Sequence, residues 1–263
     1  VPDVKTQRWV VIAPGRTARP SQVHGEPSVC PFCLGNESLT PPEVSRVNGK
    51  SSSDWLVRVV PNKYPITDIH EVVIHCADHK LDLTDLPLSH VEIIFKAYRE
   101  RFRILAKNGQ VLIFNNKGVK SGESLFHAHS QIVVLPNQIK LDVLPLEPVR
   151  NIVSENGNFI TYCPDFSQWP YEVWVAPKNE GSETTFGDLG DSELESLAGI
   201  VQKILQKLLA LFPSLSYNFY IAPGANWYLR IIPRLVDRAG FELGTGLNVN
   251  IVDPAHAAED LKN

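Results

Sequence analysis

Two histidines separated by one residue stand near the middle of the chain, in the segment His127-Ala-His-Ser-Gln131. If residues 130–135 form a strand, both imidazoles point to the same face, because side chains repeat their direction every two residues. A neutral imidazole is both a metal ligand and a nucleophile. One histidine of the pair can therefore hold a metal while its neighbour stays free to react.

A Cys-x-x-Cys pair, Cys30-Pro-Phe-Cys33, lies upstream in a proline-rich segment. A redox pair of this kind normally sits where a strand feeds a helix, and no helical pattern follows here. The segment therefore favours a metal site, and structural zinc needs two more nitrogen or sulfur ligands to close a tetrahedron. The residues alone leave those two open among His24, His70, His75, Cys76, His79, His90, His127 and His129.

Two similar series of elements are expected to position these residues. The segment His70–Ile74 is echoed by Tyr171–Val175, and each copy precedes a polar loop and then apolar residues at helical spacing. Asp191 is a plausible N-cap for the second helix, whereas the first is expected over 85–107. A strand pair should follow each helix, at Gln110–Asn115 and Ser130–Leu135, then at Tyr217–Ala222 and Trp227–Ile232.

This element order predicts an α+β fold with mainly antiparallel sheets, in units at roughly 60–136 and 158–252. The 263 residues, 43% hydrophobic, suffice for one large domain or two modest ones. A net charge of −4 argues against a nucleic-acid protein, and no apolar run approaches membrane-spanning length. Four cysteines and no visible signal peptide favour the cytoplasm.

Further segments along nearly the whole chain share one pattern with the histidine pair: Asp3–Trp9, Val10–Pro20, Cys30–Glu37, Thr40–Glu43, Val60–Pro65, Phe114–Gly118, Ile231–Leu235 and Ala239–Gly246. Together they resemble the galactose-1-phosphate uridylyltransferase family, a branch of the histidine-triad superfamily. Alanine stands at position 128, where many members have proline. The match follows the family order throughout, so the signal is specific.

The resemblance implies a fold of two histidine-triad-like repeats, each a mainly antiparallel sheet with a long helix, plus an N-terminal zinc-binding arm. The repeats would cover residues 1–136 and 158–263, with a connector at 137–157. One Zn²⁺ would be held by Cys30, Cys33, His79 and His127. Many members carry a second His-x-His late in the chain, where this sequence has Asn226-Trp-Tyr228, so a second metal site is expected to be absent.

By the same resemblance, His129 would be the nucleophile and would form a covalent nucleotidyl-histidine, in a ping-pong reaction. Gln131, on the same strand face, would donate its amide to a phosphate oxygen. Arginines of the arm would face the sugar phosphate, a short loop would cradle phosphate, and late residues would grip hexose hydroxyls across a dimer interface. The implied substrate-binding residues are Arg16, Arg19, Val60, Asn62, Tyr64, Asn116, Gly122, Glu123, Ser124, Phe241, Glu242 and Gly246. Glu123 is the awkward one, because an acid should repel phosphate.

The function expected from this resemblance is a UDP-glucose–hexose-1-phosphate uridylyltransferase that acts as a homodimer. Its partners would be a nucleotide sugar and a sugar phosphate, with no nucleic acid and no membrane. The closest alternative is an ADP-glucose phosphorylase, which transfers an adenylyl group to phosphate. A second alternative, of a different class, is a nucleotide-binding relative that has kept the fold and zinc but lost turnover.

Overall fold

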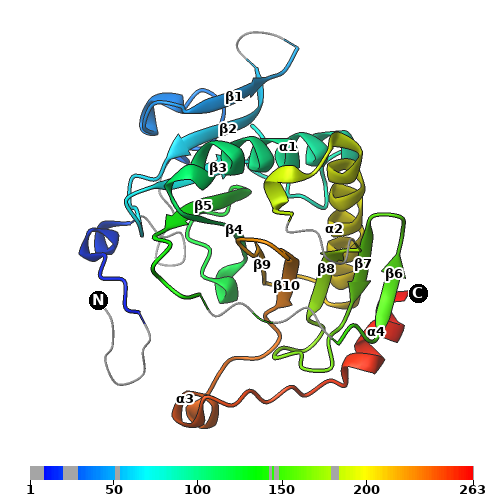
Figure 1. The fold of residues 1–263 in the computed structure, drawn as a ribbon. Helices are drawn as coiled ribbons and strands as arrows, with labels where there is room; N and C mark the ends of the chain where they lie inside the picture. Colours follow the sequence, from blue (N-terminus) through cyan, green and yellow to red (C-terminus); the bar gives the residue numbers. More distant parts are fainter. Residues whose placement is uncertain are drawn as a thin grey trace.

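The computed structural model describes residues 9–19, 29–50, 54–141, 144, 148–178 and 184–262. Within these ranges the strands form one sheet, and every neighbouring pair in it is antiparallel (Figure 1). The strands are β1 (Ser45–Asn48), β2 (Trp55–Pro61), β3 (His70–Ile74), β4 (Gln110–Lys117), β5 (His129–Leu135), β6 (Ile152–Glu155), β7 (Phe159–Tyr162), β8 (Val173–Pro177), β9 (Tyr217–Ile221) and β10 (Leu229–Pro233). The helices are α1 (Leu88–Leu105), α2 (Asp191–Leu211), α3 (Gly240–Thr245) and α4 (Pro254–Lys262).

The strand order shows two similar units that meet in the middle of the sheet. Read from either edge inward, the orders are β1-β2-β3-β5-β4 and β6-β7-β8-β10-β9, and β4 pairs with β9. Each unit places its long helix, α1 or α2, between its third and fourth strands along the chain. The α+β fold of two repeats is therefore confirmed. The exact repeat boundaries stay a prediction, since one sheet runs through both units.

The echo between His70–Ile74 and Tyr171–Val175 is wrong in register when it is matched letter by letter. Glu71 lies on the helix side of β3, where its carboxylate accepts hydrogen bonds from Arg101 of α1 at 2.8 and 2.6 Å. Glu172 lies on the opposite side, in phase with Trp174, and pairs with Arg230 of β10. Side chains alternate along a strand, so a shift of one residue reverses the face. The two units do repeat the same strand order, but the five-residue sequence match does not align structurally equivalent positions of β3 and β8.

Helices α1 and α2 pack against each other and cover one side of the sheet (Figure 1). The α1 stripe of Val91, Ile94, Tyr98, Phe102 and Leu105 is buried against the strands, as its spacing of three and four residues predicts. Asp191 proves to be the first residue of α2 and not its cap. The N-cap is Gly190, whose amide donates to Glu193 at 2.7 Å, while Asp191 accepts a hydrogen bond from Arg99 at 2.7 Å.

The other side of the sheet carries two smaller groups of buried side chains. In the first unit, Phe32 of the N-terminal loop packs with Trp55, Val60, Val72 and Ile74. In the second, the group consists of Tyr162, Trp174, Ala176, Ala222 and Tyr228, and Leu144 of the connector packs against it. On this side of the first unit, the N-terminal loop, the bend after β2 and the segment before β5 enclose a cavity.

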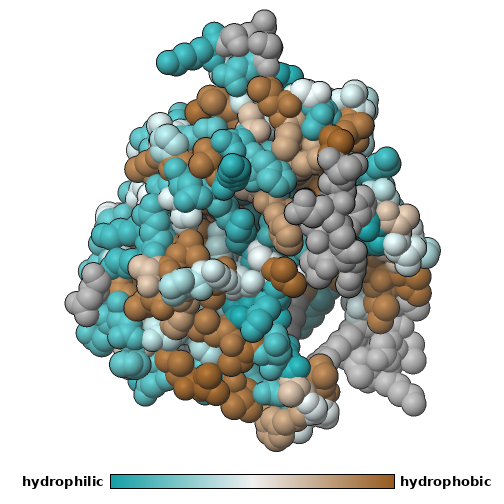
Figure 2. Space-filling view, turned by 180° about the vertical axis from the view of Figure 1, so that it is seen from behind, coloured by the Kyte–Doolittle hydropathy of each residue, from teal (hydrophilic) through white to brown (hydrophobic). Residues whose placement is uncertain are grey.

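Seen from behind, hydrophobic residues form separate patches among hydrophilic ones (Figure 2). Over the described part of the chain, no helix combines the length and the apolar character needed to cross a bilayer.

The ion pair between Glu172 and Arg230 should carry a large share of the stability of the second unit. The glutamate is fully buried, Arg230 is 7% exposed, and two hydrogen bonds of 2.7 and 2.8 Å join them. Replacing Glu172→Ala leaves a buried guanidinium without its partner, so the free energy of unfolding in urea should fall by about 3–5 kcal/mol. The exposed pair Lys96–Glu195 supplies the control, and Glu195→Ala should cost less than about 1 kcal/mol. Equal losses in the two variants would contradict this assignment.

Candidate active site and metal centre

The four predicted metal ligands come together at the end of β3 and the start of β5. One ligand atom from each of Cys30, Cys33, His79 and His127 lies within 4.8 Å of the others. The Nδ1 atom of His127 is 3.6 Å from Cys30 Sγ and 3.7 Å from Cys33 Sγ, and Cys33 Sγ is 3.5 Å from His79 Nδ1. Ligand atoms around a tetrahedral zinc with bonds of about 2.0–2.3 Å stand about 3.3–3.8 Å apart. The donor set and its spacing therefore fit zinc.

The remaining nitrogen of His127 supports the same interpretation. Its Nε2 atom is 2.8 Å from the carbonyl oxygen of Cys76, so the proton belongs on Nε2 and Nδ1 keeps its lone pair for a metal. On the cysteine loop, the side chain of Asn36 donates to the Cys30 carbonyl at 2.8 Å. Of the other histidines considered as ligands, His70, His75, His90 and His129 lie outside the cluster, and His24 lies outside the described residues.

His129 begins β5 and is 6% exposed. Its Nδ1 atom donates a hydrogen bond to the carbonyl of His127 at 2.8 Å, so Nε2 carries the lone pair. Burial, with a smaller contribution from the nearby Arg19 charge, lowers the pKa of His129 to about 4, so the ring is neutral near pH 7. From the helix side, Asn115 donates to the His129 carbonyl at 2.8 Å. The imidazole is thus neutral, and its hydrogen bond to the His127 carbonyl orients it. The backbone that carries it is held from the helix side by Asn115.

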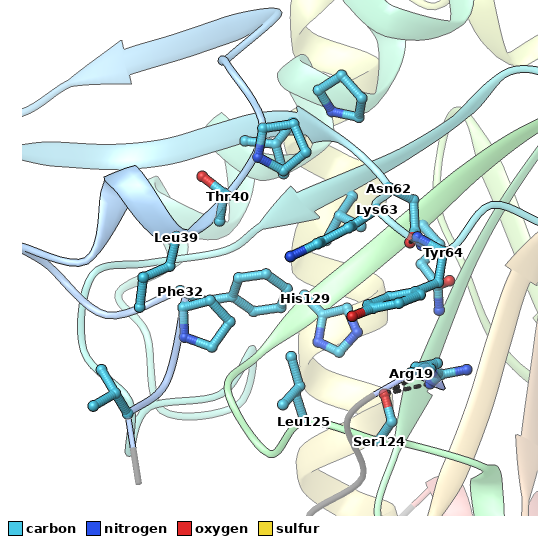
Figure 3. A pocket seen from close by; sticks show the side chains of 17 residues that line it. Arg19, Phe32, Leu39, Thr40, Asn62, Lys63, Tyr64, Ser124, Leu125 and His129 are labelled. Carbon is cyan, nitrogen blue, oxygen red and sulfur yellow. Dashed lines mark hydrogen bonds between the residues drawn. The ribbon is translucent and has the colours of Figure 1, made fainter. Parts of the chain in front are cut away.

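A cavity of about 280 Å³ opens in front of His129 (Figure 3). Seven of the predicted residues line it: Arg19, Val60, Asn62, Tyr64, Ser124, His129 and Gln131. One wall is apolar and is built by Phe32, Leu39 and Pro41 of the cysteine loop and the turn after it. Phe32 also packs against both His127 and His129, with ring centroids 6.0 and 5.3 Å away. The same loop therefore serves the metal cluster and the cavity.

The two arm arginines reach this cavity by different routes. Arg19 donates through Nε to the Ser124 hydroxyl at 2.7 Å, on the wall next to His129 (Figure 3). Arg16 donates to the backbone carbonyl of Tyr64 at 2.6 Å and does not itself line the cavity. Of the two arginines, Arg19 is thus the one that brings its charge to the cavity, and Arg16 holds the bend after β2 that contains Tyr64.

The structure removes the objection to Glu123. Its carboxylate is turned inward and accepts a hydrogen bond from the Gly118 amide at 2.6 Å, with the residue only 4% exposed. Burial raises the pKa of Glu123 to about 7, so it does not present a full charge to the cavity. Gly118 is required at this close approach because its φ is +84° and a Cβ would lie 2.3 Å from the Ser216 hydroxyl.

Five predicted substrate-binding residues besides Arg16 and Glu123 do not reach the cavity wall. Asn116 accepts a hydrogen bond from Asn218 of β9 at 2.8 Å, and Gly122 holds a left-handed turn with φ +84°. Phe241, Glu242 and Gly246 lie in or directly after α3, which stands far out on the molecule (Figure 1); Phe241 and Gly246 are exposed, and Glu242 is half-buried. Their role in binding stays a prediction.

Among the residues at the site that were not predicted are Phe32, Lys63 and His70. Lys63 extends its amine into the cavity towards Phe32 (Figure 3). His70 lies 3.0 Å from the Gln131 side chain, although 61 residues separate them in the chain. The signal for His70 was its two-residue spacing from Val72 and Ile74, which becomes informative only once β3 is known to pair with β5.

The chain is similar to known proteins in both sequence and structure. A sequence profile described as "Galactose-1-phosphate uridyl transferase, N-terminal domain" matches residues 63–137. ADP-glucose phosphorylase of Arabidopsis thaliana is 27% identical over 322 residues, covering 99% of this chain and 91% of that protein. Galactose-1-phosphate uridylyltransferase of Thermotoga maritima is 26% identical over 308 residues, covering 98% and 95%. A crystal structure of the Arabidopsis phosphorylase with bound ADP-glucose superposes with a TM-score of 0.79 at 28% identity, covering 97% of this chain and 95% of that one.

The metal centre should depend on each cysteine of the loop. Replacing Cys30→Ser removes one of four ligands, so zinc content measured by elemental analysis should fall from about one ion per chain towards zero. Cys163→Ala is the matched control, because Cys163 is buried in the second unit, away from the cluster. Unchanged zinc in the Cys30 variant, or equal loss in both, would contradict the assignment.

The raised pKa of Glu123 has a consequence for stability. The folded pKa near 7 exceeds the ordinary value of 4.5, so folding favours the protonated acid. That contribution is complete below pH 4.5 and is lost as the pH rises through 7. Glu123→Gln should therefore lose less stability than the unchanged protein between pH 4.5 and 7, in urea unfolding measured across that range. The exposed control Glu195→Gln should follow the unchanged protein, and parallel curves for all three would refute the prediction.

Proposed function

The chain belongs to the galactose-1-phosphate uridylyltransferase family, and we propose that it transfers a nucleoside monophosphate from a nucleotide sugar through a covalent intermediate on His129. The observation that carries this proposal is the hydrogen bond from His129 Nδ1 to the His127 carbonyl. It leaves the lone pair of Nε2 available at a cavity large enough for part of a nucleotide. A neutral ring in this tautomer is the form of histidine that attacks phosphorus.

In the first half-reaction, His129 Nε2 forms a bond to the α-phosphorus of the nucleotide sugar. The bond from that phosphorus to the bridging oxygen breaks, and the sugar 1-phosphate leaves with the electron pair. In the second, an oxygen of an acceptor phosphate attacks the same phosphorus, and the P–N bond breaks, which restores the imidazole. The reaction is thus a ping-pong exchange, in which one difficult transfer is split into two easier ones.

Charge that gathers on the phosphate oxygens needs donors at the cavity wall. Arg19 and the Ser124 hydroxyl stand together next to His129, and the amide of Gln131 lies on the same strand face. Donors fixed in place before the reaction stabilise a transition state without reorganisation. A zinc ion bound by Cys30, Cys33, His79 and His127 would brace the strand end that presents His129.

Two nucleotide donors are candidates. We propose uridylyl transfer from UDP-glucose to a hexose 1-phosphate, supported by the relative from Thermotoga maritima, which is named a galactose-1-phosphate uridylyltransferase. The second candidate is phosphorolysis of ADP-glucose. It is supported to a comparable degree by the Arabidopsis relative, which is known with ADP-glucose bound. In this proposal the apolar wall of Phe32, Leu39 and Pro41 packs against the face of the base, and apolar contact of this kind does not by itself select uracil or adenine.

The proposal also includes a homodimer, in which the binding site for the acceptor sugar phosphate is completed by the second copy. Phe241 is 55% exposed and Leu243 is 76% exposed on α3, so hydrophobic surface is available there for a second copy of the chain. Glu242 caps α3 by accepting a hydrogen bond from the Ala239 amide at 3.0 Å. In this proposal α3 of one copy contributes to hexose binding in the other.

The covalent intermediate provides the test. Intact-mass measurement after mixing with UDP-glucose or ADP-glucose, without acceptor, should show addition of one UMP or one AMP. His129→Asn should abolish the adduct and lower turnover at least about 10³-fold. His90→Asn is the control, since His90 bonds the backbone carbonyls of Leu56 and His75 and lies outside the cavity wall. Nucleotide binding without any adduct would instead support a relative that has lost turnover.

A further inference from the structure

His70 is a buried histidine to which neither the metal cluster nor the proposed transfer assigns a role. It begins β3 and is 4% exposed. The pairing of β3 with β5 sets His70 opposite Val133 and Val72 opposite Gln131, so all four side chains share the cavity face of the sheet. The His70 ring therefore stands beside Gln131, two residues along the strand from His129.

The tautomer of His70 follows from its contact with a backbone amide, a group that can only donate a hydrogen bond. The backbone amide of Ile66 donates to His70 Nδ1 at 3.0 Å. A backbone N–H has no acceptor alternative, so Nδ1 must offer its lone pair and the proton of the neutral ring resides on Nε2. Nε2 lies 3.0 Å from Gln131 Oε1, and it therefore donates to the carbonyl end of that side chain.

This hydrogen bond decides which end of the Gln131 amide faces the substrate. A glutamine side chain can turn over and present either its oxygen or its nitrogen. With Oε1 held by His70, the two N–H donors remain unpaired among the described residues, at a side chain that lines the cavity. Turned over, Gln131 would present an oxygen to an anionic phosphate and repel it.

The orientation of the Asn62 side-chain amide is also fixed by its neighbours. Its oxygen accepts the backbone amide of Tyr64 at 2.8 Å, so its nitrogen is the end next to His70 Nε2, at 3.1 Å. Both of these nitrogens are donors, so they cannot bond to each other. The Asn62 N–H groups are thus left for an acceptor in the cavity that Asn62 lines.

We propose that His70 is a positioning residue for the nucleotidyl transfer. Its Nε2–H holds the carbonyl end of Gln131, so that the amide N–H groups face the phosphate next to His129. The inference rests on the proposed function. It assigns to His70 no contact with the reacting atoms. Burial lowers the pKa of His70 to about 4, and the charges of Arg16 and Arg19 act in the same direction, so the required neutral form is present near pH 7.

The kinetic test compares His70→Phe, Gln131→Met and the double variant. Phenylalanine keeps the ring but removes the donor, so His70→Phe should slow formation of the nucleotidyl adduct about 10- to 100-fold, with KM for the nucleotide sugar changed less than about threefold. In the Gln131→Met background the same change should have little further effect, because His70 acts through Gln131. His70→Gln, which keeps an N–H near the Nε2 position, should recover part of the rate. If the rate losses of the two single variants multiply in the double variant, or if His70→Phe changes only KM, the proposal is overturned.

A readout that does not need activity separates this inference from the proposed function. Long-range ¹H–¹⁵N correlation spectra of the zinc-loaded protein, labelled at histidine, should show His70 as the Nε2–H tautomer. The Nδ1–H tautomer would overturn the proposal even in a fully active enzyme. If the unchanged protein forms no adduct with any nucleotide sugar while His70 is the Nε2–H tautomer, the proposed function fails and the assigned hydrogen bond stands. Melting temperature and zinc content of each variant identify any loss that comes from misfolding.

Discussion

The register between β3 and β5 is the constraint on which the site depends. It sets Ile74 opposite His129, Val72 opposite Gln131 and His70 opposite Val133. A slip of one residue would turn His129 towards the helices and bring Ser130 to the cavity side. What opposes the slip is the difference between the two faces: Val73 and Ile132 belong to the main core under α1 and α2, whereas Val72 and Ile74 pack under Phe32. Burial of unlike surfaces on both sides therefore holds the reacting histidine in place.

The helix side of the same strands carries a buried polar network that a simple hydrophobic core would not need. Tyr98 of α1 bonds His75 Nε2 at 2.9 Å and the Ser130 hydroxyl at 2.6 Å, and Ser130 is also 2.9 Å from His75. Asn115 adds the contact to the His129 carbonyl. Buried hydrogen bonds are short-range and directional, so they fix the position of the strand more tightly than apolar contacts do. The hydrogen bonds that fix β5 thus lie on the helix side of the sheet, and the cavity in which His129 would react lies on the opposite side.

The sequence predicted those features that depend on residues close together in the chain. The two cysteines stand close to each other in sequence, and so do the two histidines, so spacing alone indicates a metal loop and a shared strand face. The choice of His79 and His127 as the remaining ligands came from the family resemblance, and the four residues do lie together. Helix α1 follows from its stripe of apolar residues. Phe32 and Lys63 reach the cavity through loops, and His70 reaches Gln131 through the pairing of β3 with β5. These contacts join distant segments, which no local pattern encodes. The inward turn of Glu123 depends on a single amide, that of Gly118. The false register of Glu71 and Glu172 has the same origin, because a five-residue match cannot tell which face a strand will bury.

The second unit shows what the same scaffold becomes without a histidine pair. Asn226-Trp-Tyr228 stands where a second His-x-His would lie, with Asn226 at φ +59° and Trp227 buried in the main core. Tyr228 stacks on Trp174 with ring centroids 4.1 Å apart, and the Leu144 amide donates to its hydroxyl at 3.1 Å. Aromatic rings, a connector residue and the Glu172–Arg230 pair thus fill the side of the sheet that stays open in front of His129. A face packed in this way stabilises the shared sheet. The cavity in front of His129, by contrast, is lined by residues of the first unit, because there loops cover the sheet.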